Sequence, residues 1–493
     1  MILRHLPALI VVLPLLAATL CAMLRRPHAA WLLALVVSLA IPPLALALLL
    51  QVLAEGHVSY WLGNWQPPWG IEYRVDAANG FLLLLVSLVG GAVMIYARDS
   101  VDREIAEDRR VWFYAMYLLC LTGQLGMTMT GDAFNVFVFM EIGSLSTYVL
   151  IAMGRDRRAL VAAYQYLVLG TIGATFFVIG VGFLYLTTGT LNLADLAERL
   201  PQVADRRAIM VGLAFIVVGL SLKLALFPLH QWLPNAYGYA PSIATAFLAA
   251  TATKVVIYLL LRFVFTVFGR TLPFEELALP TLLVALSLAA IGYASVTAIH
   301  KDNVKVMLAY SSVAQIGYIT LGIAFGSETG LTGGIVHLFN HGMMKGALFL
   351  LVGAVAYRTG TVTVAGIAGL ARRMPVTFAG IAVAGLSMIG VPGTVGFVSK
   401  WYLVMAALER GWWWLAVLVV GGSLFALVYM GRIVEAAYFR RAAAPAESIA
   451  EAPLSLLVPA WALVAGCVYF GLDTELTVEV ARGAARTLLR LSP

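Results

Sequence analysis

Charged residues are scarce in this chain. Asp, Glu, Lys and Arg make up 12% of its 493 residues and hydrophobic residues 62%, whereas a soluble globular chain is roughly 25% charged. This composition excludes a set of soluble domains and indicates a membrane protein. A helix that crosses a bilayer needs about 20 apolar residues, so about 14 such helices with short connections occupy nearly the whole chain and leave no room for a soluble catalytic domain.

Cysteine is also scarce. Cys21, Cys120 and Cys467 each lie alone in an apolar run. This excludes a disulfide framework and the spacings that bind iron–sulfur clusters or haem. We therefore expect no redox centre, no hydrolytic site, no cofactor and no metal in this chain.

The net charge of +7 follows from membrane topology. Lys and Arg are concentrated in the connections after odd-numbered spans, for example at 25–26, 109–110 and 155–158. The positive-inside rule places these connections in the cytoplasm and both termini outside. The apolar run at 5–24 lacks a clear cleavage site and is expected to be a first spanning helix. The charge does not indicate a nucleic-acid partner.

We expect an all-α polytopic membrane protein that contains two inverted repeats of five helices. Three helices occupy 1–110, and the repeats occupy 111–270 and 271–440. The segment 441–493 holds a last spanning helix and an amphipathic tail. An odd number of helices in each unit makes the repeats inverted.

Two of the spans contain helix-breaking residues. Pro228 and Pro234 lie in the apolar run at 208–236, and Pro392 and Gly393 lie in the run at 376–405. Exposed backbone at membrane depth is tolerated only where it is buried in protein or lines a polar cavity. Each break falls in the fourth helix of its repeat. Interrupted helices at matching positions are typical of inverted-repeat transporters.

The chain has only six lysines, and four of them lie inside spans: Lys223, Lys254, Lys345 and Lys400. Arginine stays protonated in proteins, whereas a lysine removed from water can release its proton near neutral pH because burial disfavours the charged form. A charge in the bilayer is costly, so these lysines are candidates for a proton path. The alternative is a bias toward Arg codons with a few lysines that reach the membrane surface.

Glu141 is the one carboxylate that the sequence places deep in a span, and Lys223 is its candidate partner. Separating such a pair would change the protonation of both groups, so the pair could act as a switch. The alternative is a static ion pair that joins two helices.

His337, His341 and Lys345 recur every four residues and therefore share one helix face. We interpret this face as a proton relay. Two histidines at this spacing could also bind zinc, but no nearby Cys, Asp or Glu completes a set of ligands. Histidines that only pack between helices remain a further alternative.

Several long motifs resemble those of the proton-conducting membrane transporter family. The motifs are KLALFPLHQWLPNAY (223–237), TKVVIY (253–258), DNVKVMLAYSSVAQIGY (302–318), HLFNHGMMK (337–345) and GVPGTVGFVSKW (390–401). The family comprises antiporter-like subunits of respiratory complex I, of membrane-bound hydrogenases and of Mrp-type cation/proton antiporters. Within it, the chain looks most like the D subunit of an Mrp-type Na⁺/H⁺ antiporter.

The resemblance implies a role for each candidate residue. Glu141 and Lys223 would form the input ion pair and Lys254 the central relay. His337, His341 and Lys345 would pass the proton onward, and Lys400 would be the output residue.

The resemblance also implies a setting: a bacterial inner membrane, other membrane subunits as partners, and H⁺ and Na⁺ as transported ions. A proton pump subunit of complex I or of a hydrogenase is the alternative. A membrane anchor without conduction is a third.

Overall fold

The computed structural model describes residues 2–441 and 449–491, which are nearly all helical. Twelve helices in these residues are long and apolar enough to cross a membrane. They are α1 (Leu6–Met23), α2 (Pro27–Glu55), α3 (Ala77–Glu104), α5 (Ala133–Ala152), α6 (Arg158–Thr188), α8 (Arg206–Leu224), α10 (Ser242–Leu261), α11 (Leu279–Ile299), α12 (Val304–Phe325), α13 (Glu328–Thr359), α16 (Trp413–Phe439) and α17 (Leu454–Leu472). A π-helical turn, η5 (Arg262–Val267), extends α10.

Two further crossings bring the described residues to the fourteen that the sequence predicts. α4 (Arg110–Met129) has 20 residues and packs against α1 and α5. α14 (Pro375–Ile389) and α15 (Val395–Glu409) are the short halves of one interrupted crossing. The other interrupted crossing is formed by α8 and α9 (Trp232–Tyr239).

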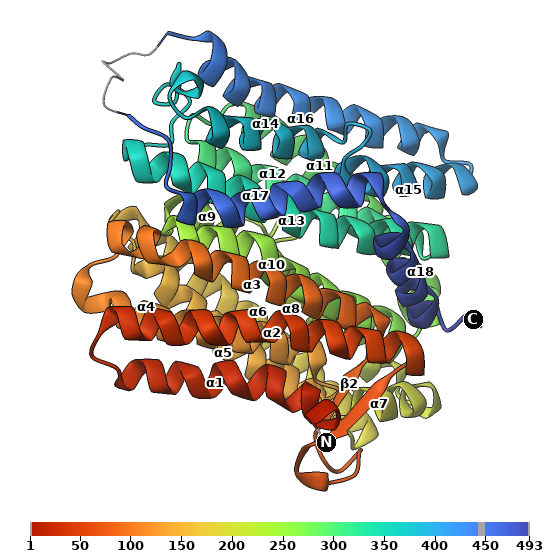
Figure 1. Ribbon diagram of the computed structural model, residues 1–493. Helices are drawn as coiled ribbons and strands as arrows, with labels where there is room; N and C mark the ends of the chain where they lie inside the picture. The colour runs from red at the N-terminus through yellow and green to blue at the C-terminus, as the bar shows by residue number, and fades with distance from the viewer. Residues whose placement is uncertain (1, 442–448, 492–493) are drawn as a thin grey trace.

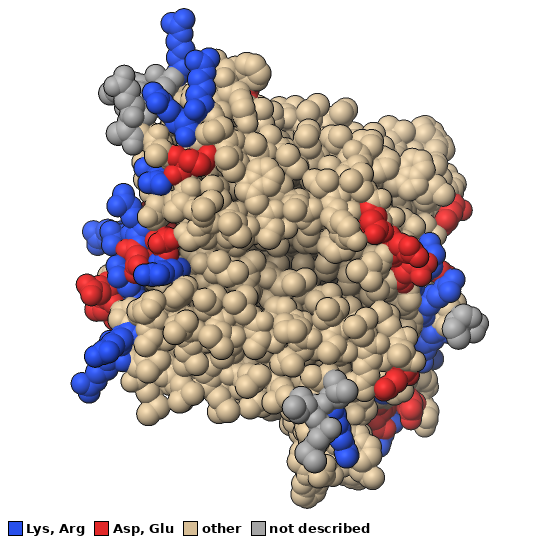
Figure 2. Space-filling model, in the orientation of Figure 1, with Lys and Arg blue, Asp and Glu red and all other residues tan. Residues whose placement is uncertain are grey.

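The helices run roughly parallel, and the two ends of the chain lie at the same end of the bundle (Figure 1). Figure 2 shows charged side chains at both ends and an almost uncharged belt between them. Lys and Arg are most abundant at the end where α1 turns into α2, opposite the termini. The chain is therefore a multi-pass membrane protein.

The first interruption separates α8 from α9. α8 ends at Leu224, and Ala225 adopts a left-handed conformation with φ 61°. Pro228 lies in the interruption as predicted, but Pro234 lies in the first turn of α9. A first-turn amide needs no intrahelical acceptor, so proline is tolerated there. The prediction of a break at Pro234 is therefore wrong.

The centre of the bundle is made by helices that are buried on all sides. Every residue of α13 from Gly330 to Val355 is buried, and α12 is nearly as enclosed. α10 packs against α13 and α3. Polar side chains on these three helices therefore face other helices, where they need protein or water partners.

The connections contain one element that the sequence does not predict. The connection between α2 and α3 contains an antiparallel hairpin of β1 (Val58–Trp61) and β2 (Glu72–Val75). Tyr73 of β2 also forms a bridge with Thr130 at the end of α4, so a tertiary contact stabilises strands that are too short to be identified from their pattern. The expected amphipathic segments form α7 (Leu193–Arg199) and α18 (Glu475–Leu489).

Candidate functional site

Glu141 and Lys223 face each other from α5 and α8. Glu141 Oε1 and Lys223 Nζ are 3.7 Å apart, and Lys223 Nζ also donates to Ser144 Oγ at 2.6 Å. The Lys223 side chain is 2% exposed and the Glu141 side chain 26%. The ammonium group therefore has two competing partners, and its hydroxyl contact is the shorter one.

The interruption beside Lys223 is held by an aromatic side chain. Trp232 Nε1 donates to the carbonyl O of Leu222 at 2.9 Å, in the last turn of α8, where carbonyls lack a full set of intrahelical donors. The Trp232 ring stacks on Tyr166 of α6 with centroids 3.8 Å apart. A cavity of about 30 Å³ adjoins Lys223 and reaches α10 at Ala252. The cavity has room for water between Lys223 and α10, the helix that carries Lys254.

Lys254 is fully buried in the middle of α10. Its Nζ donates to the carbonyl O of Ala249 and to Thr253 Oγ1, the latter at 3.3 Å. Among the described residues it forms no ion pair with a carboxylate. α13 passes close by, because a Cβ on Gly342 would lie 2.8 Å from the carbonyl O of Ala250. Among the described residues, the Lys254 ammonium is thus held by neutral oxygens of its own helix, which packs closely on α13.

The structure places His337, His341 and Lys345 on one buried face of α13, as their spacing predicts. The two imidazole rings are nearly parallel, with centroids 6.2 Å apart. Lys345 Nζ donates to the carbonyl O of Leu308 at 2.8 Å and to Ser311 Oγ, both on α12. α12 therefore supplies the oxygens that hold this lysine.

The two histidines have different surroundings. His337 Nε2 donates to Gln315 Oε1 at 2.9 Å, so Nδ1 of the neutral ring accepts from Ser399 Oγ at 2.7 Å. Ser399 directly precedes Lys400, so His337 links α12 to the half-helix α15. Neither ring nitrogen of His341 has a protein partner among the described residues, although the ring is fully buried. Buried polar atoms of this kind usually bind water.

Lys400 points into the second interruption. Its Nζ donates to the carbonyl O atoms of Met388 at 3.0 Å and Ile389 at 2.8 Å, and to Ser423 Oγ at 3.0 Å. These carbonyls belong to the last turn of α14, where no further turn supplies donors. The C-terminal end of a helix carries partial negative charge and stabilises a cation. The interruption thus creates the binding site for the lysine.

The second interruption depends on glycine. Gly390 and Gly393 have φ of 92° and 83°, a region that favours glycine. A Cβ on Gly396 would lie 1.8 Å from the carbonyl O of Ser387. Only glycine allows α15 to approach the end of α14 this closely. Pro392 and Gly393 lie between the two half-helices, where the sequence predicts the break.

The helices that carry the four candidate lysines pack in succession, α8 against α10, α10 against α13 and α13 against α15, and these lysines are called the row below. The four lysines lie on four crossings, and in the described residues only Lys223 has a carboxylate nearby. In the part of the chain that the structure describes, several buried polar atoms of the surrounding helices have no hydrogen-bond partner, namely Gln124 Oε1, Glu141 Oε1, Tyr148 Oη, Asn340 Oδ1, both His341 nitrogens and Tyr429 Oη. Water at such atoms would connect the titratable groups into a path for protons.

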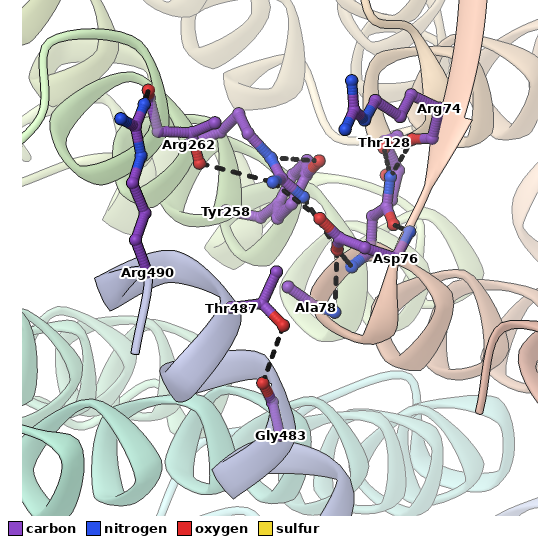
Figure 3. A network of polar contacts seen from close by, with 11 residues as sticks. Arg74, Asp76, Ala78, Thr128, Tyr258, Arg262, Gly483, Thr487 and Arg490 are labelled. Atoms are coloured by element: carbon purple, nitrogen blue, oxygen red, sulfur yellow. Dashed lines mark hydrogen bonds and ion pairs between the residues drawn. The ribbon is translucent and has the colours of Figure 1, made fainter. Parts of the chain in front are cut away.

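The sequence does not identify a second buried ion pair, Asp76 with Arg262 (Figure 3). Arg262 Nη1 lies 2.7 Å from Asp76 Oδ2, and Arg262 Nε donates to Tyr258 Oη at 3.0 Å. Burial acts to raise the pKa of the Asp76 carboxyl, but the Arg262 guanidinium and the backbone N–H of Ala78 hold it below its usual range. The pair joins the start of α3 to the end of α10, and sequence gives no signal for it because Asp76 lies in a polar connection.

Arg432 and Lys305 are two further basic residues whose side chains bind backbone carbonyls of the bundle. Arg432 of α16 donates to the carbonyl O atoms of Ile299 and Lys301. Lys305 is one of the two lysines that the sequence places in the connections between spans. In the structure it is instead buried in the first turn of α12. The apolar run that follows it directly is the signal that could have shown this.

Comparisons with known proteins agree with this fold. Residues 130–426 match the family model described as NADH:quinone oxidoreductase/Mrp antiporter, TM. The chain is 43% identical to NADH-quinone oxidoreductase subunit N of Desulforudis audaxviator, over 96% of each chain. It is 29% identical to the D subunit of a Na⁺/H⁺ antiporter of Alkalihalophilus pseudofirmus, over 87% of this chain and 85% of that protein. A chain of the Mrp complex from Dietzia sp. DQ12-45-1b superposes with a TM-score of 0.89 at 26% identity, covering 99% of this chain and 98% of the other.

Proposed function

Because this chain belongs to the NADH:quinone oxidoreductase/Mrp antiporter family, we propose that it is the proton-translocating subunit of a multisubunit monovalent cation/proton antiporter. The partners are other membrane subunits of the same complex, and the exchanged cation is Na⁺. Its relatives include the D subunit of a Na⁺/H⁺ antiporter and a chain of an Mrp complex, and these support the proposal.

The observation that carries the proposal is the row of four buried lysines held mainly by carbonyl and hydroxyl oxygens. A lysine locked in a tight ion pair keeps its proton, whereas one held by neutral oxygens can lose it without leaving a buried charge unpaired. In a membrane anchor without conduction, apolar side chains at these positions would make the fold at least as stable as buried lysines do.

The ion pair at one end of the row acts as the switch. When Lys223 leaves Glu141 for Ser144, it loses the partner that favours its charged form, and it passes its proton through the adjacent cavity toward Lys254. From Lys254 the proton moves to His341 and Lys345 on α13.

The second half of the row ends at the α14–α15 interruption. His337 receives the proton and transfers it through Ser399 to Lys400. The carbonyls at the end of α14 stabilise the loaded lysine.

The test is Na⁺-dependent dissipation of a pH gradient in membrane vesicles. The vesicles come from a strain that lacks its own antiporters and expresses the complete operon. Lys223→Ala is expected to abolish transport while the complex still assembles. Persistent transport in Lys223→Ala, or in a variant with all four lysines replaced by Met, would show that the row is not the path.

A second candidate is the equivalent pump subunit of a redox-driven complex. The 43% identity to a NADH-quinone oxidoreductase subunit N favours it. In that case electron transfer in partner subunits drives the same row of lysines. Purification of the complex with its natural partners distinguishes the two. Redox subunits and quinone reduction would support the pump, and small membrane subunits with Na⁺-dependent exchange would support the antiporter.

We further propose that the chain lies in a bacterial inner membrane with both termini on the outer side. The concentration of Lys and Arg at the end opposite the termini supports this orientation. A C-terminal reporter that is active only in the periplasm is expected to be active. Activity of a cytoplasm-specific reporter instead would reverse the orientation.

The two five-helix units, 111–270 and 271–440, are proposed to be inverted repeats that move against each other. One interruption lies in each unit, before Trp232 in the first and before Val395 in the second. Each interruption lies beside a lysine of the row, which is where an inverted-repeat transporter binds its ion.

A further inference from the structure

Lys305 lines a cavity at the end of the bundle where α1 turns into α2. This end has the most Lys and Arg side chains (Figure 2) and is called the Arg-rich end below. The cavity has a volume of about 390 Å³ and lies where the ends of α3, α10, α12 and α13 meet. Its charged lining residues are Arg103, Glu104, Arg155, Asp156, Arg158 and Lys305. Through this cavity, water and charged side chains lie next to the first turn of α12.

The lysine is almost fully enclosed by protein although it lines this cavity. It is 6% exposed, and its Nζ donates to the carbonyl O of Ala240 at 2.6 Å. A lysine that served only to reach the membrane surface would extend its ammonium group into the water instead.

No carboxylate among the described residues forms an ion pair with Lys305, although two line the same cavity. Glu104 Oε2 accepts from the backbone N–H of Ser242 at 2.8 Å, and Asp156 is bound by Arg158 at 2.7 Å. Lys305 thus resembles the lysines of the row, because it too is buried and held by a neutral oxygen.

α12 connects this lysine with the relay. Leu308 lies one turn beyond Lys305, and its carbonyl O accepts from Lys345 Nζ at 2.8 Å. Ser311, in the next turn, accepts from the same Nζ, and Gln315 accepts from His337. One helix therefore carries polar groups at successive turns from the cavity to the relay face of α13.

We propose that Lys305 is a second proton entrance, which delivers protons from the cavity to Lys345, and that transport needs both this entrance and the Glu141–Lys223 pair. This inference rests on the proposed proton translocation. It assigns to the second repeat an entrance of its own, so that each half of the chain is loaded from the Arg-rich end.

The decisive comparison uses Lys305→Met, Lys305→Arg and the control Lys301→Met in the vesicle assay with the complete complex. Lys301 lies four residues earlier, above the Tyr310 ring, and is not part of the cavity lining. Both Lys305 variants are expected to lower proton transport by about 100-fold, the lower end of what a positioned proton-transfer group contributes. Lys301→Met is expected to transport normally.

The arginine variant separates proton transfer from charge. Arginine keeps the charge and the hydrogen bond to Ala240 but does not release a proton. Normal transport by Lys305→Arg would show that Lys305 only joins the end of α9 to α12, and would overturn the proposal. Normal transport by Lys305→Met would do the same. If Lys223→Ala also transported normally, the proposed function itself would fail.

A second measurement covers the case in which the Lys305 variants fail to assemble. The native cysteines Cys21, Cys120 and Cys467 are all buried, so an introduced cysteine can be labelled selectively. Thr361→Cys lines the cavity, and Ala106→Cys is exposed on the α3–α4 connection outside it.

A membrane-impermeant, positively charged thiol reagent is then applied from each side of the membrane. Block of transport through Thr361→Cys from the Arg-rich side, with no block through Ala106→Cys, is expected. Labelling of Thr361→Cys without loss of transport would show that the cavity is not an entrance.

Discussion

The imidazole rings of His337 and His341 are nearly parallel and 6.2 Å apart, yet within the described part of the chain only His337 has protein partners for its nitrogens. His337 is fixed between Gln315 and Ser399. His341 lies near Lys254 and Lys345 and has no hydrogen-bond partner among the described residues. The first ring is positioned by the fold, and the second is free to exchange partners.

Replacing each histidine should therefore have different consequences. His337→Ala leaves Gln315 Oε1 without its partner, at a cost of about 1–3 kcal/mol for a buried group, and leaves the Ser399 hydroxyl with only carbonyls of its own helix, so we expect a lower melting temperature and loss of transport. His341→Ala removes no protein hydrogen bond, so we expect loss of transport with little change in stability. Thermal unfolding of the purified complex and the vesicle assay measure the two effects. Equal destabilisation by both variants would contradict the assignment.

Ser144 is expected to control the rate at which Lys223 leaves Glu141. A hydrogen bond to a charged group contributes about 1.5–3 kcal/mol, and Ser144→Ala removes the one that competes with the carboxylate. We expect slower transport and normal assembly. Ser146 lies two residues further along α5 and donates to the Ile142 carbonyl, so Ser146→Ala is the matched control. An equal effect of both changes would show that Ser144 has no special role.

Gly396→Ala should disrupt the second interruption. The added Cβ would lie 1.8 Å from the Ser387 carbonyl O, and overpacking of this kind costs about 1–3 kcal/mol or more. We expect lower thermal stability and loss of transport, because Lys400 loses the carbonyls at the end of α14. Gly431→Ala on α16 is the control, since its Cβ would meet nothing within 4 Å. Unchanged melting of both variants would contradict the geometry of this site.

Asp76→Asn should destabilise the fold rather than act on transport alone. Removing one partner of a buried ion pair costs about 3–5 kcal/mol, because Arg262 stays buried without compensation. The low pKa of Asp76 means that its contribution is present above the pKa of the unfolded chain and is lost as pH falls through the folded value. Thermal unfolding across acidic pH should show a shallower acid loss in Asp76→Asn. Glu435→Gln, in an exposed pair with Arg440, should melt like the unchanged protein.

The sequence predicts the crossings and breaks well because they depend on local properties. Apolar length defines the helices, and Pro228 and Gly393 mark interruptions that no tertiary contact can remove. The four-residue spacing of His337, His341 and Lys345 fixes a shared face in any helix. These features belong to the backbone and its nearest neighbours.

The partners of the lysines could not be predicted in this way. Ser423 and Ser144 are ordinary residues of apolar helices until folding brings them to Lys400 and Lys223. Asp76 and Arg262 are 186 residues apart. The charge pattern misplaces Lys305 because a charge at a helix boundary suits a solvent-exposed connection equally well.

The excess of lysines over carboxylates in the row has a consequence for the whole assembly. If all four lysines were charged at once, Glu141 alone would balance them, and their mutual repulsion would act across a medium that screens poorly. The four lysines therefore favour a state in which only some of them are protonated. Protonation of one lysine then lowers the proton affinity of the others, which release a proton more easily. A neighbouring subunit that presents a carboxylate at either end would change how many protons the row holds, without touching any lysine directly.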